Sequence, residues 1–73
     1  MTIKQAFSQA LKAARKERNL RQDMAAELLK LSIREYGNLE RGNSSPSAET
    51  LIRIYREFGI DLYKLDFDLS NKE

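Results

Sequence analysis

The chain has 73 residues, a length at which one hydrophobic core can just hold a fold together, so we expect a single domain. It contains no cysteine and no histidine, which excludes disulfides, thiolate and imidazole metal sites, cysteine nucleophiles and histidine bases. The formal net charge is only +2, but residues 1–34 carry eight basic against three acidic side chains, and residues 35–73 carry five against eight.

Two functional classes are disfavoured by this composition. The serines, carboxylates, lysines and tyrosines that remain form no catalytic spacing, so we expect no enzyme, no cofactor and no small-molecule ligand. No apolar run approaches the roughly 20 residues that span a bilayer, and the N-terminus lacks the apolar core of a signal peptide. We therefore expect a cytoplasmic protein without membrane contact. The basic half suits a polyanion, although a solvated helix surface explains it at least as well.

A first helix is predicted at about residues 3–18. Thr2 and Gln5 have the spacing of a capping box, in which each side chain accepts from the other residue's backbone N–H. Apolar residues then recur at the spacing of one helix face: Ile3, Ala6, Phe7, Ala10, Leu11 and Ala14.

Two short helices follow, separated by a few residues centred on Lys30. Asn19 breaks the first pattern, and the second helix has an apolar stretch: Met24, Ala25, Ala26, Leu28 and Leu29. Ser32 and Glu35 form another capping box, so the third helix should begin at Ser32 and end at Gly42. Two short helices joined by a tight turn are the outline of a helix-turn-helix, although many small helical bundles share it.

Residues 42–47 are the one clear loop, and two further helices are expected after it. Ser47 should cap a fourth helix that ends at Gly59, and Asp61 should cap a short fifth helix that runs through Leu65. The sequence therefore predicts an all-α fold: a compact five-helix domain over residues 1–65, with a tail at residues 66–73.

Helical geometry sorts the third helix into two faces. At about 100° per residue, a narrow stripe turns inward: Ser32, Tyr36 and Leu39. The outward arc carries polar side chains and a glycine: Arg34, Gly37, Asn38 and Arg41. Arginine can pair with guanine, asparagine with adenine, and Ile33 near the tip can touch a thymine methyl. Gly37 costs roughly 1 kcal/mol in a helix interior, which a close approach of DNA would explain. A solvated face with a tolerated glycine is an equally good interpretation of these residues alone.

Residues 7–65 resemble the repressor and Cro type of helix-turn-helix DNA-binding domain, the lambda-repressor-like or XRE family. The matching residues run from the first predicted helix to the last: Leu11, Arg15, Leu20, Gln22, Ala26, Ser32, the run Leu39-Glu40-Arg41-Gly42, Pro46-Ser47 and Phe58-Gly59-Ile60-Asp61-Leu62. The chain departs from the pattern at Ala25, Lys30 and Tyr36, where the family usually has leucine, glycine, and isoleucine or valine.

The resemblance implies a function and a set of site residues. It implies a sequence-specific transcriptional regulator, most often a repressor, that reads a palindromic double-stranded operator through the major groove as a homodimer. The base-reading positions fall on Ile33, Arg34, Gly37 and Asn38. The phosphate-contacting positions fall on Arg21, Gln22, Ser32, Arg41 and Asn43. Arg15 and Glu40 occupy the positions of a structural ion pair.

A protein-interaction module, such as an antitoxin that binds a partner protein and DNA only secondarily, is the alternative. The tail residues Phe67 and Leu69 are compatible with a partner-binding arm or a dimer contact, and equally with packing on the domain's own core.

Overall fold

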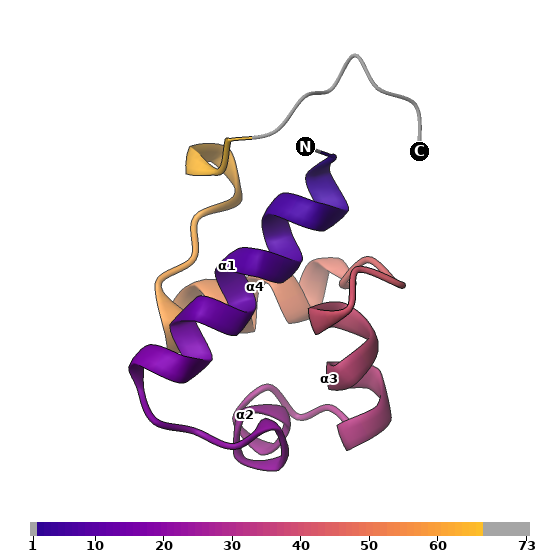
Figure 1. Cartoon of the computed structure of the whole chain (residues 1–73), viewed down its shortest axis with the longest axis vertical. Coiled ribbons are helices and arrows are strands. Elements are labelled where there is room, and N and C mark those ends of the chain that lie inside the picture. The colour runs from indigo at the N-terminus through magenta and orange to yellow at the C-terminus, as the bar shows by residue number, and fades with distance from the viewer. Residues whose placement is uncertain (1, 67–73) are drawn as a thin grey trace.

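The computed structural model describes residues 2–66, which fold into four α-helices and one turn of 3-10 helix. The elements are α1 (Ile3–Glu17), α2 (Gln22–Leu28), α3 (Ile33–Glu40), α4 (Ala48–Phe58) and η1 (Leu62–Lys64). Figure 1 shows α1 crossing in front of α4, with α2 at the lower end of the molecule and α3 along one side. The helix α3 packs against both α1 and α2, while α4 packs against α1. The expected all-α class is confirmed.

The N-terminal ends of the helices are set by local sequence. Both predicted capping boxes are formed, at Thr2 with Gln5 and at Ser32 with Glu35. The Ser47 hydroxyl accepts a hydrogen bond from the Thr50 backbone N–H at the start of α4, as expected. The helical segment of α3 begins one residue after the expected Ser32 because Ser32 is the N-cap and has extended backbone angles.

The predicted fifth helix is wrong in type, because the chain forms only a three-residue 3-10 turn there. Gly59, with φ at 68°, ends α4 in the left-handed conformation, so the chain must restart after it. The Lys64 N–H then bonds to the Asp61 carbonyl at 3.0 Å and the Leu65 N–H to the Leu62 carbonyl at 3.3 Å. This three-residue spacing brings Leu62 and Leu65 to one side, where both pack against the core.

The core is one cluster of side chains from all four α-helices: Phe7, Leu11, Ala14, Ala25, Ala26, Leu29, Tyr36, Leu39, Ile54 and Phe58. Two of the departures from the family pattern, Ala25 and Tyr36, lie in it with no exposed surface. Both departures therefore lie at positions where side-chain volume affects core packing.

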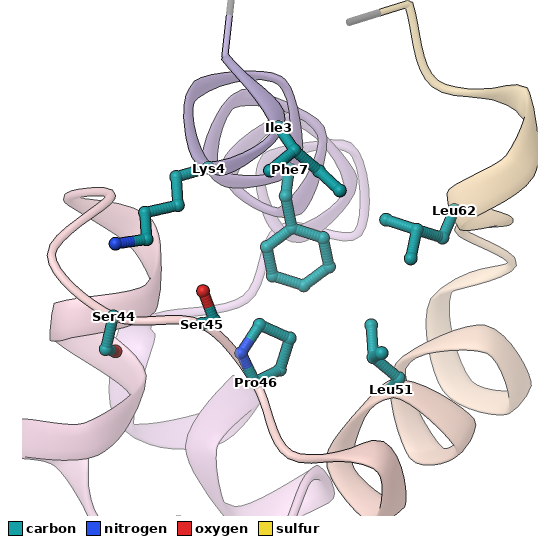
Figure 2. Close-up of a pocket in the computed structure, with 8 residues that line it drawn as sticks. All are labelled: Ile3, Lys4, Phe7, Ser44, Ser45, Pro46, Leu51 and Leu62. Atoms are coloured by element: carbon teal, nitrogen blue, oxygen red, sulfur yellow. The ribbon is translucent and has the colours of Figure 1, made fainter. Parts of the chain in front are cut away.

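The α3–α4 loop is closed onto the start of α1. Figure 2 shows the Phe7 ring pointing toward Pro46, with Leu51 of α4 and Leu62 of η1 beside it. These side chains surround a hollow of about 120 Å³. That volume is below the roughly 300–1,000 Å³ typical of pockets for small ligands, so packing is the role we assign to this cluster.

Glu40, the last residue of α3, is the centre of a hydrogen-bond network between three helices. Its carboxylate is 3% exposed and accepts from the Arg15 guanidinium at 2.6 and 3.2 Å, forming the ion pair that the resemblance implied. The Tyr36 hydroxyl also donates to it, and the Gln22 amide donates at 3.1 Å. Arg15 in turn donates to the Leu20 carbonyl at 2.9 Å. The network therefore fixes the C-terminal end of α3 to α1 and to the first residue of α2.

The electrostatics of this network favour its charged form. Burial would raise the pKa of the Glu40 carboxyl, but the hydrogen bonds from Arg15, Tyr36 and Gln22 outweigh it and hold that pKa below its ordinary value. The hydrogen bond to Glu40 raises the pKa of Arg15 despite opposing desolvation. Burial, followed by the bond to Glu40, raises the pKa of the Tyr36 hydroxyl, so it stays a donor. These three titratable groups therefore keep their protonation states at neutral pH.

The turn between α2 and α3 contains a residue in a left-handed conformation. Lys30 has φ at 59°, the value that the family's usual glycine adopts without steric cost. The Leu31 N–H donates to the Ala26 carbonyl at 2.9 Å and closes the end of α2. The turn thus has a lysine in a conformation that favours glycine.

The first prediction concerns the ion pair. In a Tyr36→Phe background, so that no hydroxyl loses its acceptor, Arg15→Met should lower the free energy of unfolding by about 3 kcal/mol, because a buried carboxylate is left without its cation. Adding Glu40→Met should restore part of that loss. Urea unfolding of the four members of this double-mutant cycle measures the coupling, and additive single-mutant costs would contradict a formed pair.

The second prediction concerns Lys30. Replacing it by glycine removes the left-handed strain at the cost of unfolded-state entropy, so Lys30→Gly should raise the free energy of unfolding by up to ~1 kcal/mol. Thermal unfolding followed by circular dichroism measures the change, with Lys12→Gly on the exposed side of α1 as a control that should be destabilised. A less stable Lys30→Gly variant would contradict the strain at this turn.

Candidate nucleic-acid interface

The outer side of α3 is open to solvent along its N-terminal half. Ile33 is 60% exposed, and Arg34 and Glu35 are exposed beside it, while Tyr36 and Leu39 point into the core as their spacing predicted. Ser32 is exposed and not part of the inward stripe, because as the N-cap it lies before the first helical turn. Figure 1 shows α3 along one side of the molecule, where no other helix covers its outer side.

The residues expected to read bases differ in how far they are exposed to solvent. Arg34 and Asn38 are one helical turn apart and so lie on the same face, with Arg34 exposed and Asn38 half-buried. Gly37 is buried, contrary to its predicted place on an open outward arc. The guanidinium of Arg41 covers it: a Cβ built on Gly37 would lie 2.9 Å from Nη1 of Arg41. The space beside the missing side chain is therefore occupied by Arg41.

Arg41 is also hydrogen-bonded to Asn38 of α3. Its Nη2 donates to Oδ1 of Asn38 over 2.7 Å, and the two residues lie three apart at the end of α3. The Asn43 backbone N–H donates to the Asn38 carbonyl at 2.9 Å, which holds the chain after the helix close to the same point. Asn38, Arg41 and Asn43 are therefore brought together, with Arg41 and Asn43 exposed.

The two residues at the start of α2 that are expected to contact phosphates each interact with another side chain of the protein. Arg21, the N-cap of α2, makes an exposed ion pair with Asp23 at 3.1 Å. The bond from Arg21 lowers the pKa of the Asp23 carboxyl. Gln22 is half-buried, and its amide nitrogen is engaged by Glu40 as described above. Arg21 thus remains accessible to a polyanion, whereas the Gln22 side chain has an inward partner.

Sequence reasoning missed three of these contacts. The pairing of Tyr36 with Glu40 had a signal, since residues four apart on a helix are neighbours. The pairing of Arg41 with Asn38 had the same kind of signal at a spacing of three. The Gln22 contact with Glu40 depends on how α2 crosses α3, so local spacing could not reveal it.

The described part of the chain was also searched for a metal site and for a membrane-spanning helix. Within residues 2–66 there is no cluster of three or more acidic side chains placed to hold a metal ion. None of the helices found there has the length and apolar character needed to cross a membrane. What these residues do provide is a face of α3 on which Arg34 and Arg41 are exposed and Asn38 is half-buried. Arg21, also exposed, is the N-cap of α2, which packs against α3.

Comparisons with known proteins agree with this geometry. The sequence matches the helix-turn-helix domain family over residues 8–66, which include both α2 and α3. None of the curated proteins compared matches the sequence. Two chains from crystal structures of the clp gene regulator ClgR from Corynebacterium glutamicum have a similar fold, each at 24% sequence identity. One has a TM-score of 0.75 over 86% of this chain and 67% of its own length. The other has a TM-score of 0.73 over 86% and 82%.

The family match covers most of the chain, and the structure places a helix-turn-helix within it. Members of this family bind DNA and are not enzymes, in agreement with the composition of the chain. The chain therefore belongs to the helix-turn-helix domain family, in its repressor-like (XRE-like) form.

Proposed function

We propose that this domain is a sequence-specific transcriptional regulator that inserts α3 into the major groove of an operator. The observation that carries the proposal is the contrast between the two sides of α3. Its inner side is fixed by Tyr36, Leu39 and the Glu40 network, while its outer side presents Ile33 and Arg34 to solvent. A major groove about 12 Å wide admits one α-helix, and a rigidly held helix keeps its base contacts in register.

The proposed contacts divide into base reading and positioning. Arg34, on the exposed face of α3, is suited to a bidentate pair with O6 and N7 of guanine, and Ile33 is suited to a thymine methyl group. Asn38 is the second polar base contact. The proposed phosphate contacts lie at the start of α2 and directly before and after α3 in the chain: Arg21, Gln22, Ser32, Arg41 and Asn43.

We further propose that two copies bind a palindromic operator and repress transcription by occupying it, in the cytoplasm. Half-sites one helical turn, ~34 Å, apart would present the same groove to each α3. Exposed apolar side chains on α4 and η1, namely Ile52, Tyr55 and Tyr63, support a contact between copies. The tail residues 66–73, with Phe67 and Leu69, were expected to contribute, but Phe67 and Leu69 lie outside the described residues. Sedimentation with and without the duplex tests this stoichiometry.

The third prediction tests base reading by Arg34. Arg34→Ala should weaken binding to the preferred site by ~1–3 kcal/mol and relax the choice at one base pair per half-site, most often G·C, because the bidentate pair with the base can no longer form. Binding to random DNA should fall much less. Fluorescence anisotropy with both duplexes measures the ratio of the dissociation constants for random and preferred DNA. Equal weakening on both would make Arg34 a phosphate anchor, and no weakening on either would favour the protein-interaction alternative.

The fourth prediction tests positioning by Arg21. Arg21→Ala should weaken binding to preferred and random duplexes alike, since a phosphate contact carries no sequence information. It should also reduce the slope of log Kd against log salt by about 0.9, the value for one phosphate neutralised by one cation. Lys12→Ala, on the exposed side of α1, removes the same charge outside the residues proposed to contact DNA or a second copy, and it should leave the slope nearly unchanged. An unchanged slope in Arg21→Ala would contradict the assignment.

A further inference from the structure

Glu35, in the first turn of α3, places a negative charge on the helix that is proposed to enter the major groove. Its side chain is exposed, and none of the ion pairs found within residues 2–66 includes it. A negative charge at this place weakens the general attraction to a polyanion. Attraction to phosphates therefore does not account for it.

The capping hydrogen bonds of α3 do not require the charge either. Oε1 of Glu35 accepts from the Ser32 N–H at 2.9 Å, and the Glu35 N–H donates to the Ser32 hydroxyl at 3.0 Å. Gln5 and Thr2 form the same box at the start of α1, at 2.9 and 3.2 Å. An uncharged glutamine therefore fills this position elsewhere in the chain. What a carboxylate adds is its interaction with the helix dipole, which is small at an exposed site.

The capping box holds the Glu35 carboxylate in place and leaves part of it free to accept. The hydrogen bonds from Ser32 lower the pKa of the Glu35 carboxyl, so the group is ionised at neutral pH. An ionised carboxylate only accepts hydrogen bonds, and it has about four acceptor sites. Within residues 2–66 its hydrogen-bonding partner is Ser32, whose N–H and hydroxyl can occupy about half of these sites. The remaining sites are open to an outside donor.

Glu35 and Asn38 lie on the same side of α3. They are three positions apart and so are neighbours on the helix, as Asn38 also is with Arg34. Glu35 and Asn38 line one open hollow together with serines of the loop that follows α3: Ser44, Ser45 and Ser47. No basic side chain is among the described residues that line it. A base edge that meets Asn38 therefore lies next to an acceptor that no cation covers.

The chemistry of the major groove indicates which base this acceptor fits. Guanine presents two acceptors, O6 and N7, and thymine presents O4. Adenine presents its N6–H₂ donor next to the acceptor N7, whereas cytosine presents the N4–H₂ donor alone. A group that only accepts is therefore complementary to cytosine.

We propose that Glu35 is a further specificity-determining residue, whose carboxylate accepts a hydrogen bond from N4 of a cytosine in each operator half-site. The proposal rests on the proposed function, since it requires α3 to enter the major groove. It goes beyond that function because Glu35 is not among the base-reading or phosphate-contacting positions assigned above. It also assigns a penalty to sites without the cytosine, since the carboxylate then faces acceptors.

Selection of bound sequences from a random DNA pool, with the wild-type domain and with Glu35→Gln, tests the proposal. Thermal unfolding establishes that the variant is folded, as the glutamine box of α1 leads us to expect. Because glutamine also donates, the preference for cytosine at one position of the half-site should fall about fivefold or more, the lower end of what a mismatched base pair costs. Glu17→Gln, on the exposed side of α1, removes the same charge away from α3 and should keep the wild-type preference.

Removal of the cytosine amino group gives a sharper comparison. Replacing the selected cytosine by 2-pyrimidinone, which lacks the 4-amino group, should weaken binding of the wild-type domain by about fivefold or more. The same replacement should affect Glu35→Gln much less, because the variant no longer depends on that donor. Fluorescence anisotropy measures the four dissociation constants, which form a double-mutant cycle between one side chain and one base.

The possible failures can be told apart. An equal loss in both proteins, or a selection that Glu35→Gln leaves unchanged, would overturn the proposal and leave the proposed function intact. Tighter binding of Glu35→Gln to all duplexes by one factor would show that Glu35 only repels phosphates, and would also overturn it. A wild-type pool without any preferred sequence would instead contradict the proposed function, and the inference would fall with it.

Discussion

The structure depends on one buried carboxylate, that of Glu40. A carboxylate that is almost fully removed from water costs several kcal/mol unless its oxygens are paired, and here both oxygens are paired. The donors come from three helices: Arg15 from α1, Gln22 from α2 and Tyr36 from α3 itself. Each helix must therefore keep its position for the charge to stay compensated. Among the described residues no buried side-chain polar atom lacks a partner, so the network is complete.

This constraint gives α3 two sides with different tasks. The inner side consists of apolar packing and the Glu40 network, and it sets the rotation of the helix about its axis. The outer side carries Arg34 and Asn38, and the base contacts proposed for them require that rotation to be fixed. Arg41 lies at the boundary, since it follows Glu40 directly, and its guanidinium turns back over the outer side. A residue of the stabilising network and a residue of the proposed DNA interface are thus consecutive in the chain.

Features set by local chemistry were predictable from the sequence. The capping boxes at Thr2 and Ser32 and the helix end at Gly59 follow from single residues or fixed spacings, and the structure has them. The pairing of Arg15 with Glu40 came from the family resemblance. It could not be derived from spacing, because 25 positions separate the two residues.

The remaining features depend on tertiary packing or on competition between side chains. The segment after Asp61 has helical apolar spacing, but only three residues adopt helical geometry, and their bonds are of the 3-10 type. Gly37 was predicted to leave room for DNA, and Arg41 occupies that room instead. Gln22 was expected to face a phosphate, and the crossing of α2 over α3 gives its amide a partner in Glu40. In each case the residue type indicated that the position was unusual, but the contact that the residue makes depends on the tertiary structure.

The proposed function requires that α3, held in place by the Glu40 network, enters the major groove. The most direct measurement is an NMR titration of the folded domain with its selected duplex, following every backbone amide. If α3 is the reading element, the largest shift changes should occur at residues 32–43 and at Arg21 and Gln22, with little change along α4 and η1 beyond what dimer formation produces. Large changes confined to α4 and η1, with the amides of α3 unaffected, would contradict the claim.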